Sequence, residues 1–206
     1  MGFDRSLTKA ALDGALAATD RAALEPGRIG AHLNRIWVTP PAHARAVIGW
    51  ARENQHLDPS HGFLHFGALL ATTPFVVPIA VSAGRQVAKQ AGVSAEQVQA
   101  DVAKALGTTK TTTTGIANVM TTLRNIGLFI GTEERPIGTR PAVPKPLAGW
   151  FTHVLLVARR AYEVSDTAWR TAPELALLGA RPTGGVQRYP HFELRLKDGI
   201  TLVRER

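Results

Sequence analysis

Residues 94–131, SAEQVQADVAKALGTTKTTTTGIANVMTTLRNIGLFIG, predict two helices joined by a short polar turn. Ser94 followed by Gln97 has the spacing of a capping box, which starts a helix, and Gly107 is the residue type that ends one. The second helix is expected over 110–126, because its apolar residues recur in steps of three and four, as a single buried face requires. That face consists of Ile116, Val119, Met120, Leu123 and Ile126.

The segments on either side complete the pattern of a winged helix-turn-helix. Upstream, a helix is expected over 74–91, with Thr73 as N-cap and Pro74 in the first turn. Its predicted inner face is Val77, Ala80, Val81, Gly84, Val87, Ala88 and Ala91. Downstream, Gly127 ends the third helix, and the β-prone run LFI leads into GTEERPIGTRP at 131–141, which has the glycine, charge and proline of a wing.

The rest of the chain predicts a mainly helical protein with a C-terminal β-hairpin. Helices are expected over 6–18, 27–37, 42–54, 147–162 and 173–178. Ala42, Val47, Ile48 and Trp50 are expected inward in the third of these, and Phe151, Val154, Leu155, Ala158 and Tyr162 in the fourth. Two alternating runs flank Asp198–Gly199, a strong hairpin dipeptide. The predicted divisions are an N-terminal helical region 1–73, a winged helix-turn-helix 74–145, and C-terminal helices and hairpin 146–206.

The outward face of the helix at 110–126 suits close contact with DNA. Placing residues at 100° intervals puts short hydrogen-bonding side chains and cations opposite the apolar face: Lys110, Thr111, Thr114, Asn118, Thr121 and Arg124. No acidic residue occurs between Lys104 and Thr132, whereas a solvated helix usually mixes both charges. Such side chains approach phosphates and base edges closely. Arg135 and Arg140 are the expected wing contacts, although Glu133 and Glu134 weaken them.

The excess of basic residues favours a polyanionic partner such as nucleic acid. The 206 residues carry 24 Lys+Arg against 16 Asp+Glu, a formal net charge of +8. The excess begins at the motif, since residues 84–149 hold eight basic and four acidic residues, while 1–83 hold seven and six. The chain has no cysteine, which excludes disulfides and thiolate metal sites. The start MGFDRSLTKAALDG lacks a long apolar run, so we expect a cytoplasmic protein.

Patterns that suggest other chemistry are incomplete. The stretch GTTKTTTTG at 107–115 lacks the residue order of a phosphate-binding loop. His56, Asp58, His61 and His65 cluster in sequence, but a metal needs three or four ligands, and the flanking Phe63 and Phe66 favour core histidines. No hydrolase motif is present. We therefore expect no catalytic residue, no metal, no cofactor and no small-molecule substrate.

The segment 59–84 contains no Asp, Glu, Lys or Arg and allows three interpretations. It is long enough to span a bilayer, but Pro74 and Pro78 interrupt it and the following helix continues into Arg85. A buried core is therefore favoured over a membrane span. The third interpretation is a docking surface for a partner protein, which would make the chain an assembly module.

The run at 92–131 resembles the winged-helix segment of the BrxA-type proteins of bacterial BREX phage-defence islands. MTTLRNIGLF, Met120–Phe129, stands where those proteins close the recognition helix, and the downstream order of linker, helix and terminal strands is also similar. The resemblance covers about a fifth of the chain and does not extend to its N-terminal third. It implies a non-enzymatic accessory protein that binds double-stranded DNA beside other defence proteins. A protein-interaction module or a transcriptional regulator is the alternative.

Overall fold

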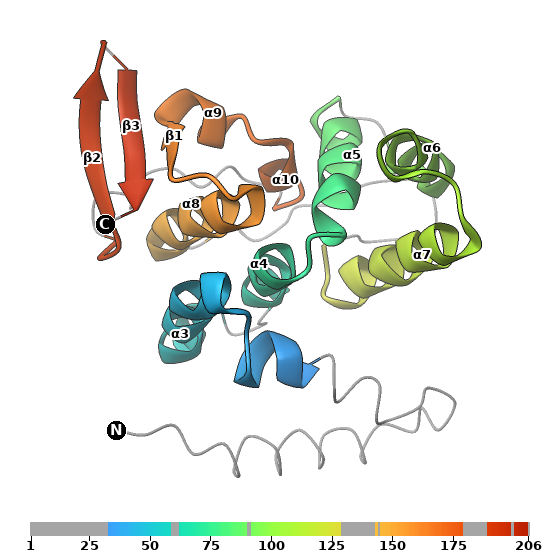
Figure 1. Cartoon of the computed structure of the whole chain (residues 1–206), viewed down its shortest axis with the longest axis horizontal. Helices are drawn as coiled ribbons and strands as arrows, with labels where there is room; N and C mark the ends of the chain where they lie inside the picture. Colours follow the sequence, from blue (N-terminus) through green and yellow to red (C-terminus); the bar gives the residue numbers. More distant parts are fainter. Residues whose placement is uncertain are drawn as a thin grey trace.

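The computed structural model describes residues 33–58, 62–89, 92–128, 143, 145–178, 189–198 and 200–205. Over these residues the protein is mainly helical, with a small antiparallel sheet near the C-terminus (Figure 1). The predicted helix at 6–18 and the predicted wing, with Arg135 and Arg140, lie outside the described residues.

The helices follow one another closely along the chain. A π-helical turn (η1, Asn34–Val38) and a 3-10 turn (η2, Ala42–Ala44) lead into α3 (Arg45–Glu53), and a second 3-10 turn (η3, Gln55–Leu57) follows it. The remaining helices are α4 (Gly62–Thr72), α5 (Val76–Ala88), α6 (Ala95–Leu106), α7 (Lys110–Asn125), α8 (Lys145–Arg159), α9 (Asp166–Arg170) and α10 (Pro173–Ala176). The strands are β1 (Glu163–Ser165), β2 (Phe192–Lys197) and β3 (Ile200–Glu205).

The C-terminal hairpin forms as predicted. Strand β2 pairs antiparallel with β3, and Lys197 lies opposite Ile200 across the turn. Asp198 has a φ of 51°, a left-handed conformation that hairpin turns require and that Asp tolerates. The sequence did not predict β1, which pairs with the other side of β3 and gives the order β1-β3-β2.

The apolar segment at 62–72 is the centre of the core. Every residue of α4 is buried except the half-buried His65, so this helix is enclosed by the chain itself. It packs against α8, where Trp150 lies so close to Gly67 that a Cβ there would meet the indole ring at 2.2 Å. The buried Asp58 lies before the helix and accepts a hydrogen bond from the Leu64 N–H at 3.0 Å.

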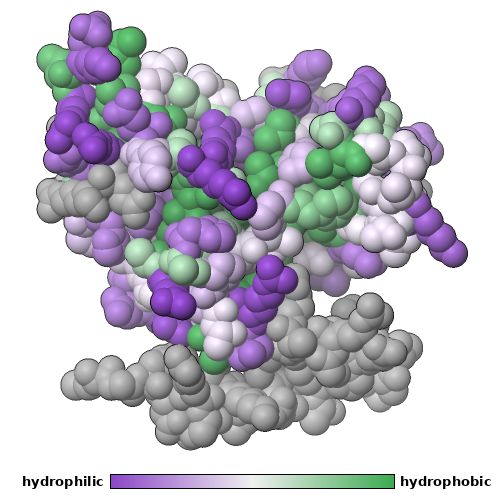
Figure 2. Space-filling model, in the orientation of Figure 1, coloured by the Kyte–Doolittle hydropathy of each residue, from purple (hydrophilic) through white to green (hydrophobic). Residues whose placement is uncertain are grey.

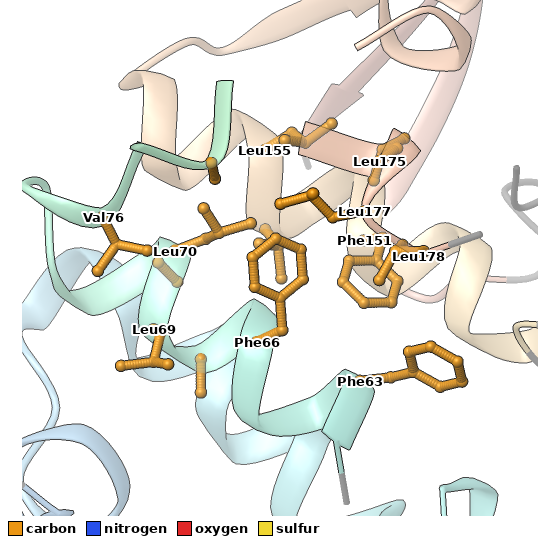
Figure 3. Close-up of a cluster of buried hydrophobic side chains, with 14 of the residues drawn as sticks. Phe63, Phe66, Leu69, Leu70, Val76, Phe151, Leu155, Leu175, Leu177 and Leu178 are labelled. Atoms are coloured by element: carbon orange, nitrogen blue, oxygen red, sulfur yellow. The ribbon is translucent and has the colours of Figure 1, made fainter. Parts of the chain in front are cut away.

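Helix α8 connects three parts of the core. Trp150 is fully buried, donates its indole N–H to the Val47 carbonyl at 2.9 Å and stacks on Trp50. Figure 3 shows side chains of α4, α8 and the α10 region converging around Phe66 and Phe151. The buried cluster includes residues from all three predicted divisions. The boundaries at 73 and 145 remain a prediction.

The inner face predicted for α3 is partly wrong. Val47 and Ile48 are buried as expected and Trp50 is half-buried, but Ala42 is exposed. It belongs to the preceding 3-10 turn, whose tighter winding directs Ala44 inward instead.

The inner face predicted for α5 is also partly wrong. Ala80 and Gly84 are buried, but Ala88 is exposed, and the buried positions that the pattern missed are Val76, Ile79, Ser82 and Ala83. The cause is the surroundings of the helix, because α5 contacts α4, α6, α7 and α10. A helix with neighbours on several sides is buried over a wide arc, and its hydrophobic pattern does not select one face.

The predicted cap of α5 is wrong. The helix begins at Val76, with Phe75 as N-cap and no side-chain cap. The Thr73 carbonyl accepts the Val76 N–H at 2.9 Å, so the backbone forms a turn before the helix begins.

The end of α8 differs from the prediction as well. The helix ends at Arg159, and Arg160 has a φ of 52°, which turns the chain into β1. Tyr162, predicted inward, is therefore 81% exposed. Arg159, the last residue of the helix, links α8 to α10. It forms a bidentate ion pair at 2.8–2.9 Å with the buried Glu174 on α10.

Within the described part of the chain, none of the helices has the length and apolar character needed to cross a bilayer.

Candidate nucleic-acid interface

Helices α5, α6 and α7 contact one another and form a compact group (Figure 1). In that view α5 runs vertically, α6 is seen nearly end-on, and α7 lies across the right-hand side, away from the C-terminal hairpin. The three helices therefore cross one another steeply, and α7 lies at the periphery of the molecule.

The inner face of α7 is the one predicted from periodicity. Ile116, Met120 and Leu123 are buried, and Val119 and Ile126 are half-buried against the core. One further contact sets the position of the helix. A Cβ on Gly115 would meet the Phe75 ring at 2.8 Å, so this glycine lets α7 approach the start of α5 closely.

Both ends of α7 are closed by local signals. Thr109 is the N-cap, and its hydroxyl accepts the Thr112 N–H at 3.0 Å. At the other end Gly127 has a φ of 77°, and the Leu128 N–H donates to the Leu123 carbonyl at 3.0 Å. This pair of features is a Schellman motif, so the predicted termination at Gly127 is correct.

Ser94 is the N-cap of the preceding helix, as predicted, but the full capping box does not form. The Ser94 hydroxyl accepts the Gln97 N–H at 3.2 Å, as a capping box requires. The reciprocal bond does not form between these two described residues, because the Ser94 N–H donates to Gln86 Oε1 of α5 at 2.8 Å. Gln97 instead donates to Asp101 at 2.9 Å. Helix α6 is thus held to α5 at its N-cap residue.

The outward face of α7 is open to solvent. We define the α7 strip as the six predicted residues on this helix: Lys110, Thr111, Thr114, Asn118, Thr121 and Arg124. All six are exposed. Figure 2 shows the surface around α6 and α7, on the right, as mostly pale with isolated strongly hydrophilic side chains, which agrees with a surface of threonine and alanine between cations.

Helix α6 carries two carboxylates, Glu96 and Asp101, and Asp101 is hydrogen-bonded to α5. Asp101 accepts hydrogen bonds from Ser82 Oγ at 2.7 Å and from Gln97, and Lys104 Nζ lies 3.9 Å from it. The hydrogen bond from Ser82 is the main cause of the lowered pKa of Asp101, followed by the bond from Gln97. The carboxylate is therefore ionised and directed toward α5.

Asp101 gives the protein a pH-dependent link between α5 and α6. Because folding lowers the pKa of this group below its usual 3.8, the link stabilises the protein above that pH and is lost as the pH falls through the folded value. We expect the unfolding free energy of Asp101→Asn to depend less on pH than that of the wild type between about pH 5 and pH 2. Urea denaturation at several pH values measures this, and an equal pH dependence in the variant and the wild type would contradict the link.

The dimensions of the α7 strip suit the major groove. Lys110 and Arg124 are 14 residues apart, which corresponds to about 21 Å along a helix. The major groove is about 12 Å wide, so cations near the two ends can reach phosphates on both walls while the residues between them face base edges. Thr114, Asn118 and Thr121 occupy that middle part.

The histidine cluster of the sequence does not form a metal site in the described residues. His56 is exposed, Asp58 is bonded to the backbone of α4, and the His65 ring meets Trp37 edge-on at 5.1 Å. His61 lies outside the described residues. No group of three potential ligands occurs in the described part of the chain.

One contact beside the strip could not be predicted from the sequence. Gln99 of α6 reaches the Thr113 hydroxyl at 3.4 Å and links the two helices at the margin of the exposed face. Each residue alone resembles an ordinary surface side chain, and only the packing of α6 on α7 brings the two together.

Comparisons with known proteins find no matching protein family, no matching curated protein and no matching solved structure. The likeness of Met120–Phe129 to BrxA-type proteins remains a prediction from the sequence.

Proposed function

We propose that this chain is a non-enzymatic protein that binds double-stranded DNA, with α6 and α7 as its helix-turn-helix and α7 as the recognition helix. The observation that carries the proposal is that all six residues of the α7 strip are exposed, on a helix that has no carboxylate. Threonine is a poor helix former, so a helix this rich in threonine sacrifices intrinsic stability. A surface rich in threonine and free of carboxylates is well suited to contact with a polyanion.

The residues of the strip and of the wing are expected to make different kinds of contact with DNA. Lys110 and Arg124 neutralise phosphates, which provides affinity that is independent of sequence and falls with salt. Thr114, Asn118 and Thr121 are short enough to contact base edges in the groove. Arg135 and Arg140 are proposed to contact the adjacent backbone as part of a wing.

The biological setting rests on the resemblance at Met120–Phe129 alone. It implies an accessory component of a phage-defence system that works beside larger proteins, and a transcriptional regulator is the alternative with the same biochemistry. Both settings require binding to duplex DNA, so one biochemical experiment tests the shared claim.

That experiment is fluorescence anisotropy with a labelled duplex at two or more salt concentrations. The double variant Lys110→Ala with Arg124→Ala should bind about tenfold more weakly or worse, because each alanine removes a cation that pairs with a phosphate. Its plot of log affinity against log salt should also be shallower, by about 0.9 for each phosphate that the variant no longer neutralises.

The matched control removes two cations from elsewhere on the surface. Arg45 on α3 and Lys197 on β2 are both exposed, and Arg45→Ala with Lys197→Ala changes the net charge by the same amount. Equal reductions in affinity in the two double variants would show that only total charge matters and would reject α7 as the interface.

If the protein is instead an assembly module, the apolar segment at 63–83 is a poor candidate for its docking surface. The apolar segment at 63–83 is largely buried within this chain, with Phe66, Ile79 and Ala80 at 0% exposure. A partner protein would have to bind some other surface.

A further inference from the structure

We infer that strand β2 pairs with β2 of a second copy of this chain, joining two three-stranded sheets across a twofold axis. β2 lies at the end of the sheet, with β3 between it and β1. In Figure 1 it is the outermost labelled element on the left. No other described strand pairs with its outer edge, and alternate residues of an edge strand direct their N–H and C=O groups outward, ready to pair with another strand.

The charges on β2 are complementary to themselves. Glu193 and Arg195 lie two residues apart on the same face and form an ion pair at 2.7 Å within the strand. In an antiparallel pair of β2 strands centred on Leu194, each Glu193 lies opposite the Arg195 of the second copy. Edge strands that are protected against pairing commonly carry charges of a single sign, lysines above all. Such charges would repel each other in a pair of identical strands.

The charge pattern on the sheet extends toward the open edge. On the same face Glu163 of β1 lies opposite Arg204 of β3, which in turn lies opposite Glu193 of β2. The row therefore alternates in sign from strand to strand and ends at a carboxylate on the edge. Arg195 of a second copy continues the alternation.

Only one register of the two strands places Glu193 opposite Arg195 of the second copy. Centring the axis on Glu193 or on Arg195 would place like charges opposite each other, which is unfavourable. Centring it between two residues would pair residues from opposite faces of the sheet. Of the axes through Glu193, Leu194 and Arg195, the one at Leu194 avoids like charges, and it places Glu193 opposite Arg195.

An exposed apolar side chain supports the same register. Leu196 is 77% exposed, one of four large hydrophobic residues of the described chain with substantial exposure. In the proposed pair it lies opposite Phe192 of the second copy, so pairing would cover part of it. The same contact would be repeated across the axis.

This inference is independent of the proposed DNA binding. The hairpin lies at the far left and α7 at the right in Figure 1, so pairing through β2 leaves the α7 strip uncovered. A failure of one proposal does not alter the other.

The test uses two charge-reversal variants of the full chain, studied by analytical ultracentrifugation. The wild type should form dimers in a concentration-dependent manner. Arg195→Glu gives a strand with two acids and Glu193→Arg gives one with two bases, so each alone should dimerise more than about tenfold more weakly. Mixing the two variants should restore a dimer, because every acid then lies opposite a base.

Lys197→Glu is the control, since in this register residue 197 lies opposite His191 and its reversal places no like charges together. It should dimerise as the wild type does. Far-UV circular dichroism checks that both reversal variants fold. A wild type that remains monomeric at every concentration, or a mixture that stays monomeric when both variants are folded, overturns the inference.

Discussion

Replacing Gly84 by alanine should destabilise the protein by about 3 kcal/mol or more, because it forces a side chain into a filled space. A Cβ at this position would lie 1.9 Å from the carbonyl oxygen of Pro173 and 2.5 Å from its carbonyl carbon. Both atoms belong to the backbone at the start of α10, and they cannot move aside as a flexible side chain could. Relief therefore requires α5 and α10 to separate, which exposes the core between them. Urea denaturation measures the decrease in stability.

Gly49 is the matched control for this substitution. It also lies inside a helix, α3, but a Cβ there would meet nothing within 4 Å. Alanine is a better helix former than glycine by up to about 1 kcal/mol, so Gly49→Ala should stabilise the protein slightly. The two substitutions are chemically identical, and effects of equal sign and size would contradict the close packing of α5 on α10.

Glutamate in the middle of the α7 strip should weaken DNA binding strongly. The double variant Thr114→Glu with Thr121→Glu adds two negative charges where the proposal places the phosphates and bases of the duplex. We expect the affinity to fall about 100-fold or more at moderate salt, because charge repulsion and reduced counterion release act together. Glutamate is a better helix former than threonine, so α7 should not be weakened. Anisotropy titration measures the affinity.

Thr167→Glu with Thr201→Glu provides the comparison, since both threonines are exposed on α9 and β3, outside the proposed interface. This variant carries the same added charge and should lose much less affinity. Similar reductions in both variants would place the DNA elsewhere on the protein.

Local signals predicted the ends of α6 and α7 and the position of the hairpin. The ends of α7 depend on Thr109 and on Gly127, whose effects reach only a few residues along the chain. The hairpin depends on Asp198 in the turn and on the alternation of the two strands. Features of this kind are encoded in short stretches of sequence and can be recognised there.

Features that depend on distant neighbours were missed. The buried face of α5 is set by helices on several sides, so an almost uniformly apolar segment gave no unique orientation. Strand β1 is three residues long and exists because β3 offers it a partner. Tyr162 was assigned to a helical face that Arg160 brings to an end by adopting a left-handed conformation.

The candidate site also has features that the sequence could predict and features that it could not. The exposure of the α7 strip could be predicted because a helix with one apolar face must direct the other outward. The contacts that hold this helix in place could not, since Gly115 meets Phe75 and Gln99 meets Thr113 only in the folded chain.

The most direct test of the DNA-binding proposal is a nuclear magnetic resonance titration of the labelled protein with a short duplex. The proposal predicts that amide signals of Lys110–Asn125 shift or broaden as DNA is added, and that those of β3 stay in place. The changes should diminish as salt is raised. Signals of α7 that remain unchanged while DNA binds through another surface, or no change anywhere in the spectrum at low salt, would contradict it.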